Sequence, residues 1–459
     1  MRRIAVPGTV TLLAATLLAP GARAQGFAVY EHDACIMARG AAGVADPCNQ
    51  ASAVFFNPAA VLGGTRKLNI EANLTLIAPT GNFTDSATRA QTDLNKHTFP
   101  VPAGYASYQL SPRLAVGLGA YAPYGLTTDW PTTFAGRFLA YKTTIASIYV
   151  QPTVAFAVTP KFQIGGGPVY VHSSAQVHRR VDASTVGAGP ITSLSELGIP
   201  AGTDFADALF DVKGNGWGFH IGALYKVTDR LTVAARYLSQ VKINYTGTAT
   251  FTQVKTGITL PPGNPFGLPG GTSLDYVLLA AFQTGALLSN QSASTSITMP
   301  DQYVVGLAYK VLSNLSVMAD WQHTDWSLFK TLDLKLSIAP SLNEYEGYKN
   351  TDAFRVGLDW QATPKVAIRV GGLRHNGAAP DVSVTPMLPE GNRVEGTAGV
   401  GLKLTPMLTL DLAYQYLQQQ DRRGRVMDPL PGQQPTTALN TGLYKFTANL
   451  FGASLALAF

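Results

Sequence analysis

The stretch YKVTDRLTVAARY, residues 225–237, combines three signals that recur along the chain and decide its fold. It begins with the aromatic residue Tyr225 and reaches the triplet Thr228-Asp229-Arg230 three residues later. Asp and Thr suit turn geometry, so the triplet predicts a tight reversal between two strands. The residues after it alternate between an apolar set and a second set: Leu231, Val233, Ala235 and Tyr237 against Thr232, Ala234 and Arg236. Such alternation is typical of a barrel wall, with one face toward lipid and the other toward the lumen.

The same turn pattern occurs six times. The triplets are Ser111-Pro112-Arg113, Thr159-Pro160-Lys161, Thr228-Asp229-Arg230, Leu312-Ser313-Asn314, Thr363-Pro364-Lys365 and Thr405-Pro406-Met407. Three residues before them stand, in order, Tyr108, Phe156, Tyr225, Tyr309, Trp360 and Leu402. All but the last are aromatic, and amphipathic rings at one height above the turns are typical of a girdle at the membrane–water interface. A soluble sandwich would have no reason to repeat this spacing.

The number of turns also predicts the number of strands. Six short turns, with both chain ends on the same side, predict seven hairpins and therefore fourteen strands. An even number of strands that closes on itself leaves no unpaired edge, which hydrocarbon would not tolerate. The last strand ends at Phe459, and a terminal aromatic residue resembles the signal that the barrel assembly machinery recognises. We predict an all-β protein, a fourteen-stranded antiparallel transmembrane β-barrel over residues 65–459.

Composition supports a membrane barrel over a soluble domain or a helical membrane protein. Only 14% of residues are charged, against about 25% in ordinary soluble domains. No apolar run beyond residue 25 approaches the roughly 18 to 20 residues of a spanning helix. Residues 1–24 predict a secretory signal peptide, rather than a membrane anchor, with an A-x-A cleavage site at Ala22-Arg23-Ala24. Removing its three arginines lowers the formal net charge from +6 to +3, which is too mild to predict a nucleic-acid partner.

Residues 25–64 do not alternate as a strand does and are rich in Ala and Gly. We expect them to form a folded insert that plugs the lumen, since a barrel of this size either needs a plug or conducts water. The cysteines, Cys35 and Cys48, lie in this insert of a chain bound for an oxidising compartment. They form either a disulfide or two buried thiols. With His32 they lack the spacing of a metal site, and we expect no metal and no cofactor.

Connections on the side opposite the short turns are long, and two of them are apolar. The first, residues 191–210, carries Leu194, Leu197, Phe205 and Leu209. The second carries Leu274, Val277, Leu278 and Phe282 at a helical spacing. An apolar helical face outside the membrane needs a partner. The two loops therefore either pack against each other or surround an oily ligand, which makes these eight residues candidates for substrate binding.

Several motifs resemble those of the FadL/TodX-type outer-membrane transporters. The run Phe55-Phe56-Asn57-Pro58-Ala59, after Arg39-Gly40-Ala41 and Asp46, is similar to the hatch signature of that family. Further similarities are Tyr124-Gly125-Leu126-Thr127-Thr128 after the third strand, Met299-Pro300-Asp301 entering the eighth, and Thr324-Asp325-Trp326-Ser327-Leu328-Phe329 ending the ninth. The cysteine pair departs from the family pattern. The resemblance implies uptake of long-chain fatty acids or aromatic and aliphatic hydrocarbons, captured by extracellular loops. It also implies a hatch that contains Asn57, Pro58 and Ala59 and rearranges during transport. The cargo would then leave sideways through the barrel wall at a kinked third strand.

The third strand contains the means for such an opening. Gly117, Gly119, Pro123 and Gly125 follow one another along it. Pro cannot donate to a strand ladder and Gly favours bulges, so we expect a local break in pairing. The alternative is a harmless irregularity at the rim.

A carboxylate on the cargo would need a cation along the lumen. Alternation places Arg236 and Arg369 on the inward face, which makes them the candidates. Such arginines more often pair with lumenal acids, here Asp320 or Asp411.

A general diffusion porin is the main alternative, because fourteen strands can also enclose water, but the plug and the apolar loops argue against it. An enzyme would need a nucleophile and a base held together. The histidines at positions 172, 178, 323 and 375 have no recognisable companion of that kind. The sequence thus predicts a transporter of hydrophobic small molecules, not an enzyme. We expect it in the outer membrane of a Gram-negative bacterium, in contact with lipid and lipopolysaccharide.

Overall fold

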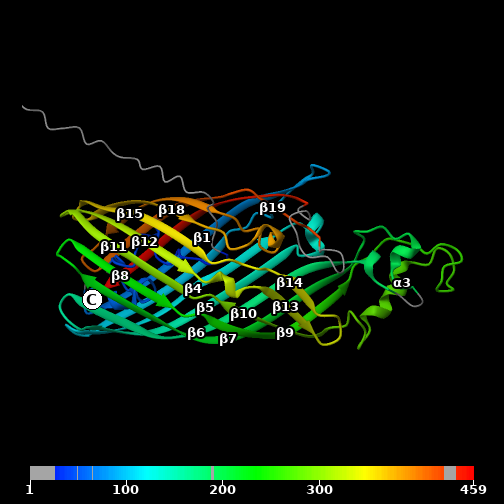
Figure 1. The fold of residues 1–459 in the computed structure, drawn as a ribbon, viewed down its shortest axis with the longest axis horizontal. Coiled ribbons are helices and arrows are strands. Elements are labelled where there is room, and N and C mark those ends of the chain that lie inside the picture. The colour runs from blue at the N-terminus through cyan, green and yellow to red at the C-terminus, as the bar shows by residue number, and fades with distance from the viewer. Residues whose placement is uncertain (1–25, 49, 65, 188–190, 428–440) are drawn as a thin grey trace, which may run out of the picture.

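The computed structural model describes residues 26–48, 50–64, 66–187, 191–427 and 441–459 (Figure 1). The expected signal peptide, residues 1–24, lies outside the described residues. None of the helices in the described part of the chain is long and apolar enough to cross a membrane.

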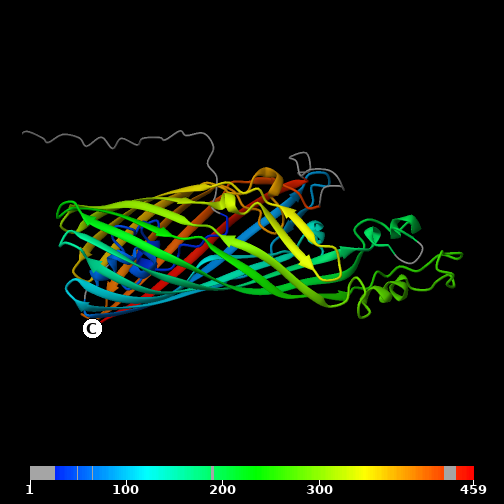
Figure 2. The same cartoon turned by 60° about the horizontal axis from the view of Figure 1, so that its bottom comes forward.

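The described strands form one closed antiparallel barrel (Figures 1 and 2). Eleven of its wall strands are single segments: β1 (Leu68–Asp85), β3 (Phe99–Ser111), β4 (Leu114–Asp129), β5 (Lys142–Ala157), β6 (Phe162–Asp182), β7 (Asp204–Lys226), β15 (Thr351–Thr363), β16 (Val366–His375), β17 (Arg393–Lys403), β18 (Leu408–Gln419) and β20 (Gly442–Ala458). Three more are split in two: β8 (Leu231–Leu238) with β9 (Val241–Gln253), β10 (Gln291–Met299) with β11 (Gln302–Leu312), and β12 (Leu315–Thr324) with β13 (Thr331–Leu336). The barrel closes where β20 pairs with β1, and the predicted fourteen strands are confirmed.

The six turn triplets lie where the sequence predicts them. Each joins two consecutive antiparallel segments at the end of the barrel where the C-terminus lies (Figure 1). The aromatic residues before them are on the outer surface; Tyr225, for example, is 45% exposed and Trp360 46%. The alternation is also as predicted, since Arg236 and Asp411 are buried inside while Ile221 and Leu412 are exposed outside.

The split strands differ from the expected arrangement. Pro300 and Asp301 separate β10 from β11 within the eighth wall strand, where the sequence pattern placed them at its entry. Proline lacks an N–H, so it interrupts the ladder there. Residues 325–330, which include the short helix η6 (Trp326–Leu328), separate β12 from β13 within the ninth strand rather than ending it. The barrel wall is therefore irregular in its eighth and ninth strands as well as at β4.

Three short segments form an insert inside the barrel, drawn in blue in Figures 1 and 2. They are α1 (Ala34–Met37), α2 (Ala53–Phe56) and η1 (Pro58–Gly63). Asp33 caps α1, accepting a hydrogen bond from the Ile36 N–H at 3.1 Å, and the Asn57 side chain caps η1. All of α1 and α2 is buried. Apolar Ala and Phe therefore face the insert's own core and the inner wall.

The remaining elements lie in the long connections. They are β2 (Gln91–Asp93), η2 (Ala135–Phe138), η3 (Ala183–Thr185), η4 (Leu194–Leu197), α3 (Leu274–Leu278), η5 (Leu279–Phe282), β14 (Leu342–Tyr345), η7 (Asp381–Ser383) and β19 (Arg422–Gly424). The loops that carry η4 and α3 project beyond the barrel, at the end opposite the C-terminus (Figure 1).

Candidate functional site

The pairing of β3 with β4 stops halfway up the wall. The ladder runs from Ser111 and Leu114 at the turn to Gly104 and Ala120, where it ends. Above that point, residues 99–103 pair with β1 alone. The register of β4 against β5 also shifts between Tyr121 and Tyr124. Pro123 lies in this shift and cannot donate to a ladder.

Residues 26–29, which precede α1 and begin the insert, lie along the unpaired edge of β4. The Val29 N–H donates to the Pro123 carbonyl, and the Gly125 N–H donates to the Phe27 carbonyl, both at 2.9 Å. This short bridge is the only cover that the described residues give to this stretch of the edge. A movement of residues 26–29 would therefore expose an unpaired edge.

A cavity of about 670 Å³ lies at the interruption. Its lining includes inward-facing side chains such as Tyr121, and residues of the outward set such as Pro102 and Ala122. Because both faces of the wall contribute, the cavity spans the wall between β3 and β4. Most of its lining is apolar, and its charged or titratable members include Glu31, His375, Arg393 and Glu395.

A second, narrower cavity of about 50 Å³ lies in the lumen beside the first. The residues that line both cavities are Phe27, Leu126, Thr144, Ile145 and Leu388. The Phe27 ring is fixed by edge contacts, with its centroid 4.7 Å from that of Trp326 and 6.2 Å from that of Tyr124. Phe27 and Leu388 thus form part of a constriction between two apolar spaces.

A loop between β16 and β17 holds the start of the insert in place. The buried Glu390 carboxylate accepts hydrogen bonds from the Gly26 N–H at 2.6 Å and the Ala379 N–H at 2.8 Å. The Trp130 indole N–H in turn donates to the Pro386 carbonyl of this loop at 3.2 Å. The contacts of Glu390 with Gly26 and of Trp130 with Pro386 join segments more than two hundred residues apart, and no local sequence signal could have revealed Glu390 or Phe27.

Glycines in the wall form a seat for the predicted hatch motif. A Cβ on Gly222 would lie 2.1 Å from Asn57 Oδ1, and one on Gly165 would lie 2.4 Å from the Pro58 carbonyl oxygen. The Asn57 amide donates to the Val44 carbonyl at 2.8 Å and to the Ala223 carbonyl of the wall at 3.2 Å. Asn57 therefore links the insert to itself and to β7, and Ala59 follows it, fully buried, in η1.

Asn57→Ala is expected to loosen the insert without unfolding the barrel. Leaving those carbonyls unpaired costs about 1 to 3 kcal/mol of local stability, whereas the strand ladder keeps all its bonds. Hydrogen exchange should be faster in residues 33–64, with the melting temperature of the barrel unchanged. Asn314→Ala, which removes a similar amide at an exposed turn, is the matched control. Failure of barrel assembly in the Asn57 variant would refute this role.

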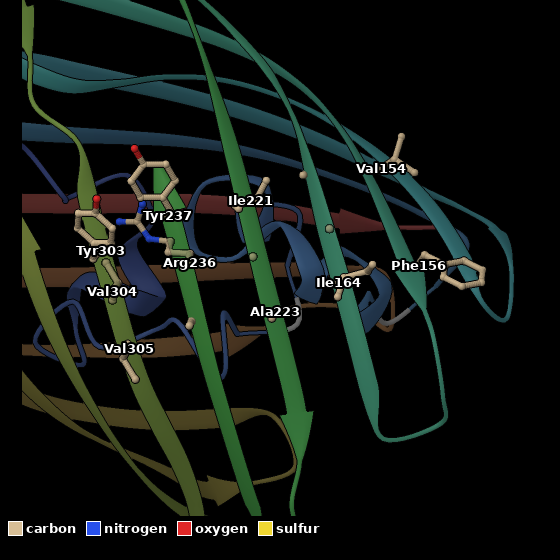
Figure 3. A pocket seen from close by; sticks show the side chains of 14 residues that line it. Val154, Phe156, Ile164, Ile221, Ala223, Arg236, Tyr237, Tyr303, Val304 and Val305 are labelled. Carbon is tan, nitrogen blue, oxygen red and sulfur yellow. The ribbon is translucent and has the colours of Figure 1, made fainter. Parts of the chain in front are cut away.

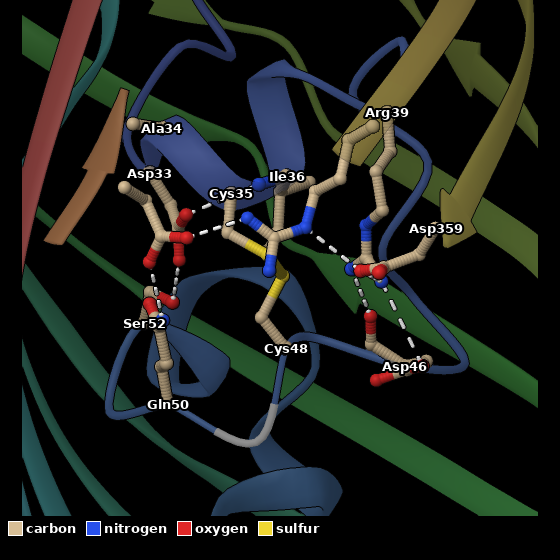
Figure 4. The surroundings of a disulfide bond; sticks show 12 residues. Asp33, Ala34, Cys35, Ile36, Arg39, Asp46, Cys48, Gln50, Ser52 and Asp359 are labelled. Atoms are coloured by element: carbon tan, nitrogen blue, oxygen red, sulfur yellow. Dashed lines mark hydrogen bonds and ion pairs between the residues drawn. A yellow bond between two sulfur atoms is a disulfide. The ribbon is translucent and has the colours of Figure 1, made fainter. Parts of the chain in front are cut away.

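A disulfide between Cys35 and Cys48 closes part of the insert (Figure 4). Beside it the Ser52 hydroxyl donates to Asp33, and the Ser52 N–H donates to Glu71 of β1 at 2.9 Å. On the other side Arg39 lies 3.6 Å from Asp359 of β15. The insert is thus cross-linked within itself and tied to opposite parts of the wall by polar contacts.

The two candidate arginines have different surroundings. Arg369 donates to Asp359 at 2.8 Å and to Asp411, so its charge is satisfied by the wall. Arg236 has no ion pair with any described residue and lies against the Phe55 ring at 4.9 Å. Pairing with Asp411, which was the alternative for such arginines, applies to Arg369 alone.

The residues predicted to open the third strand, β4, fall into two groups. A Cβ on Gly117 would lie 2.7 Å from Val54 of the insert, and one on Gly119 would lie 2.9 Å from both Val54 and Tyr105. These two make room for inward neighbours below the interruption. Gly125 lines the cavity, and a Cβ there would meet nothing closer than 3.6 Å. Pro123 and Gly125 are therefore the members of this set that lie at the break.

The apolar loop residues bury one another. The buried residues Leu194, Phe205, Leu274 and Leu278 form one cluster, against which Leu197, Val277 and Phe282 pack. Leu209 stays outside the cluster, on the outer face of β7. Of the two predicted options, the described residues show mutual packing.

A further hollow, of about 720 Å³, lies on the outer surface between β5 and β11 (Figure 3). Its rim includes Ile221 and Val305, each 50% exposed, and Ala223 contributes to its lining. These residues belong to the outward sets of their strands. The hollow therefore opens toward lipid and not toward the lumen.

Comparison with known proteins agrees with the barrel fold. The family model described as outer membrane protein transport protein (OMPP1/FadL/TodX) matches residues 15–459. A long-chain fatty acid transport protein of Salmonella typhi is 22% identical over 97% of both chains. The crystal structure of a Pseudomonas aeruginosa FadL homologue superposes with a TM-score of 0.78, at 21% identity over 95% of this chain and 100% of that one. The Pseudomonas putida toluene transporter TodX has a TM-score of 0.68, at 15% identity over 95% and 100%.

Proposed function

This chain belongs to the outer membrane protein transport protein family (OMPP1/FadL/TodX), and from that membership we propose that it imports hydrophobic small molecules sideways through its barrel wall. It is an outer-membrane protein. Its relatives are named for both fatty acids and toluene, so the proposed cargo class is apolar small molecules of either kind. The proposed role is transport rather than catalysis.

The observation that carries the proposal is the wall-spanning cavity at the end of the β3–β4 ladder. A water-filled pore offers an apolar solute no favourable environment, because burial of apolar surface is what stabilises it. An apolar cavity that opens through the wall lets the solute pass from the lumen to the bilayer without entering water. Residues 26–29 cover the unpaired edge, so we infer that they move before the cargo leaves.

Earlier steps of the route follow from the arrangement of the loops. We place capture at the outer loops around η4 and α3, where partly buried Val277 and Phe282 flank the apolar cluster. The cargo then reaches the lumenal cavity and the constriction at Phe27 and Leu388. The other proposed partners are the surrounding lipid, lipopolysaccharide and the assembly machinery, for which the half-exposed Phe459 is the recognition residue.

Two measurements on the intact chain test this function. Deleting the gene is expected to slow growth on an oily carbon source, and expression of the wild-type chain should restore it. In planar bilayers the purified protein should show little steady conductance, because the insert fills the lumen. A large, steady open-channel conductance would instead identify a general diffusion porin. Unchanged growth after deletion would exclude uptake of that substrate.

A further inference from the structure

Three polar side chains that line the lumenal cavity have no hydrogen-bond partner. They are Thr143 of β5, Thr295 of β10 and Glu346, which follows β14, and they are 4%, 7% and 8% exposed. The Oγ1 atoms of both threonines are buried and unpartnered in the described part of the chain. The Glu346 carboxyl group likewise has no hydrogen bond or ion pair with a described residue. Buried polar groups are normally hydrogen-bonded, so three such groups around one cavity indicate a ligand with a polar group of its own.

The rest of the lining is mainly apolar. It includes Ile297, two residues after Thr295 on β10, and the Phe329 ring, whose centre lies 5.0 Å from that of Tyr348. None of the described residues that line this cavity is basic. A carboxylate in the cavity would therefore meet Glu346 and find no cation. The lining suits a mostly apolar molecule with one small polar group that carries no negative charge.

Contacts with neighbouring loops hold Glu346 in place. Its N–H donates to the Lys330 carbonyl at 2.8 Å, and its carbonyl accepts a hydrogen bond from the Ser383 hydroxyl. Arg425 is close enough to influence the carboxyl group. That arginine does not line the cavity, however, and its Nη2 lies 3.6 Å from the carboxylate of Glu344. The Glu346 side chain is thus positioned by the backbone, while its carboxyl group is left to the cavity.

The surroundings of Glu346 favour its protonated form. Burial, together with the neighbouring Glu344 carboxylate, raises the pKa of Glu346 well above its usual value. A protonated carboxyl group both donates and accepts hydrogen bonds, and so does the hydroxyl of a threonine. A ligand hydroxyl group, which also donates and accepts, is the complement of all three.

We propose that Glu346, Thr143 and Thr295 form a site that binds the hydroxyl group of an otherwise apolar, neutral alcohol. This proposal rests on the proposed transport function and adds neutral alcohols to its cargo class. The polar end of the cargo is recognised in the lumenal cavity, which the constriction at Phe27 and Leu388 separates from the wall-spanning cavity.

The test compares 1-hexanol with n-hexane, which has the same chain and no hydroxyl group. Binding of each probe is measured by calorimetry on the purified full-length protein in a non-ionic detergent, for wild type and for Glu346→Leu combined with Thr295→Val. The double variant is expected to bind 1-hexanol about tenfold more weakly, since hydrogen bonds to its hydroxyl are lost, and to bind n-hexane as wild type does. Thr298→Val, on the outward face of the same strand β10, is the matched control and should change neither affinity.

Glu346→Gln tests the protonation state independently. The amide is neutral, donates and accepts, so this variant should keep its affinity for 1-hexanol within about twofold. Tighter binding of hexylamine than of 1-hexanol to wild type, lost in Glu346→Gln, would overturn the proposal in favour of an ionised carboxylate that binds amines.

Two other results would overturn the alcohol site. They are equal weakening of 1-hexanol and n-hexane in the double variant, and no change in either affinity. Retained uptake of n-hexane in those outcomes would leave the transport function standing. A wild-type protein that binds neither probe would instead count against the transport function itself.

Discussion

Replacing Gly222 with valine is expected to unseat the insert and convert the barrel into an open pore. A Cβ at this position would lie 2.1 Å from Asn57 Oδ1 and 3.0 Å from Pro58 Cδ, so the motif cannot keep its place against β7. A barrel of this size without its plug is wide enough to conduct water, and we expect steady conductance to rise roughly tenfold or more. Planar-bilayer recording measures this directly.

The neighbouring residue provides the control. The side chain of Ala223 belongs to the outward set and lines the lipid-facing hollow in Figure 3, so Ala223→Val places the same side chain on the same strand but directs it away from the insert. Its conductance should equal that of wild type. If Gly222→Val also stayed closed, the insert would not depend on this seat, and its assignment as a hatch held at Asn57 would be wrong.

Bridging β3 to β4 above their last pair is expected to stop uptake. Were the ladder continued in its present register, Pro102 would lie opposite Ala122, because Gly104 is paired with Ala120. Pro102→Cys and Ala122→Cys, joined by a short bifunctional thiol reagent, would close the opening. The described cysteines are already bonded to each other and leave the reagent no other target. Uptake of a hydrophobic probe should fall about tenfold or more, as when a gate is locked.

A second cysteine pair on the same strands distinguishes the effect of closing the opening from the effect of attaching the reagent. Ala106 and Leu118 are partners within the intact part of the ladder and belong to the outward sets. Bridging them leaves the opening as it is, so uptake should not change. Equal uptake by both bridged proteins would mean that the cargo leaves by another route.

Local sequence signals were sufficient for the barrel. The turn triplets, the aromatic residue before most of them, and the alternation after them depend on neighbours along the chain, and all are found where predicted. The strand number follows because each turn contributes one hairpin. Residues such as Tyr225 and Trp360 face outward because a girdle requires it, not because of any distant partner.

The site depended on contacts that sequence spacing does not encode. Arg236 and Arg369 look alike by alternation, yet only Arg369 meets Asp359 and Asp411 across neighbouring strands. The requirement for glycine at position 222 arises only from its contact with Asn57, which lies 165 positions earlier in the chain. Likewise, Glu390 holds Gly26 across a separation of 364 residues. Such pairs become visible only once the wall brings them together.

The central claim is that hydrophobic cargo crosses the wall between β3 and β4. Photolabelling during uptake tests it most directly, with an alkyl probe that carries a diazirine and with adducts mapped by mass spectrometry. Labelling of Tyr121 inside and of Pro102 and Ala122 outside, well above that of Ile368 on the outer face of β16, is the predicted result. Adducts that follow the inner wall toward the short turns, with Pro102 no more labelled than Ile368, would contradict the lateral route.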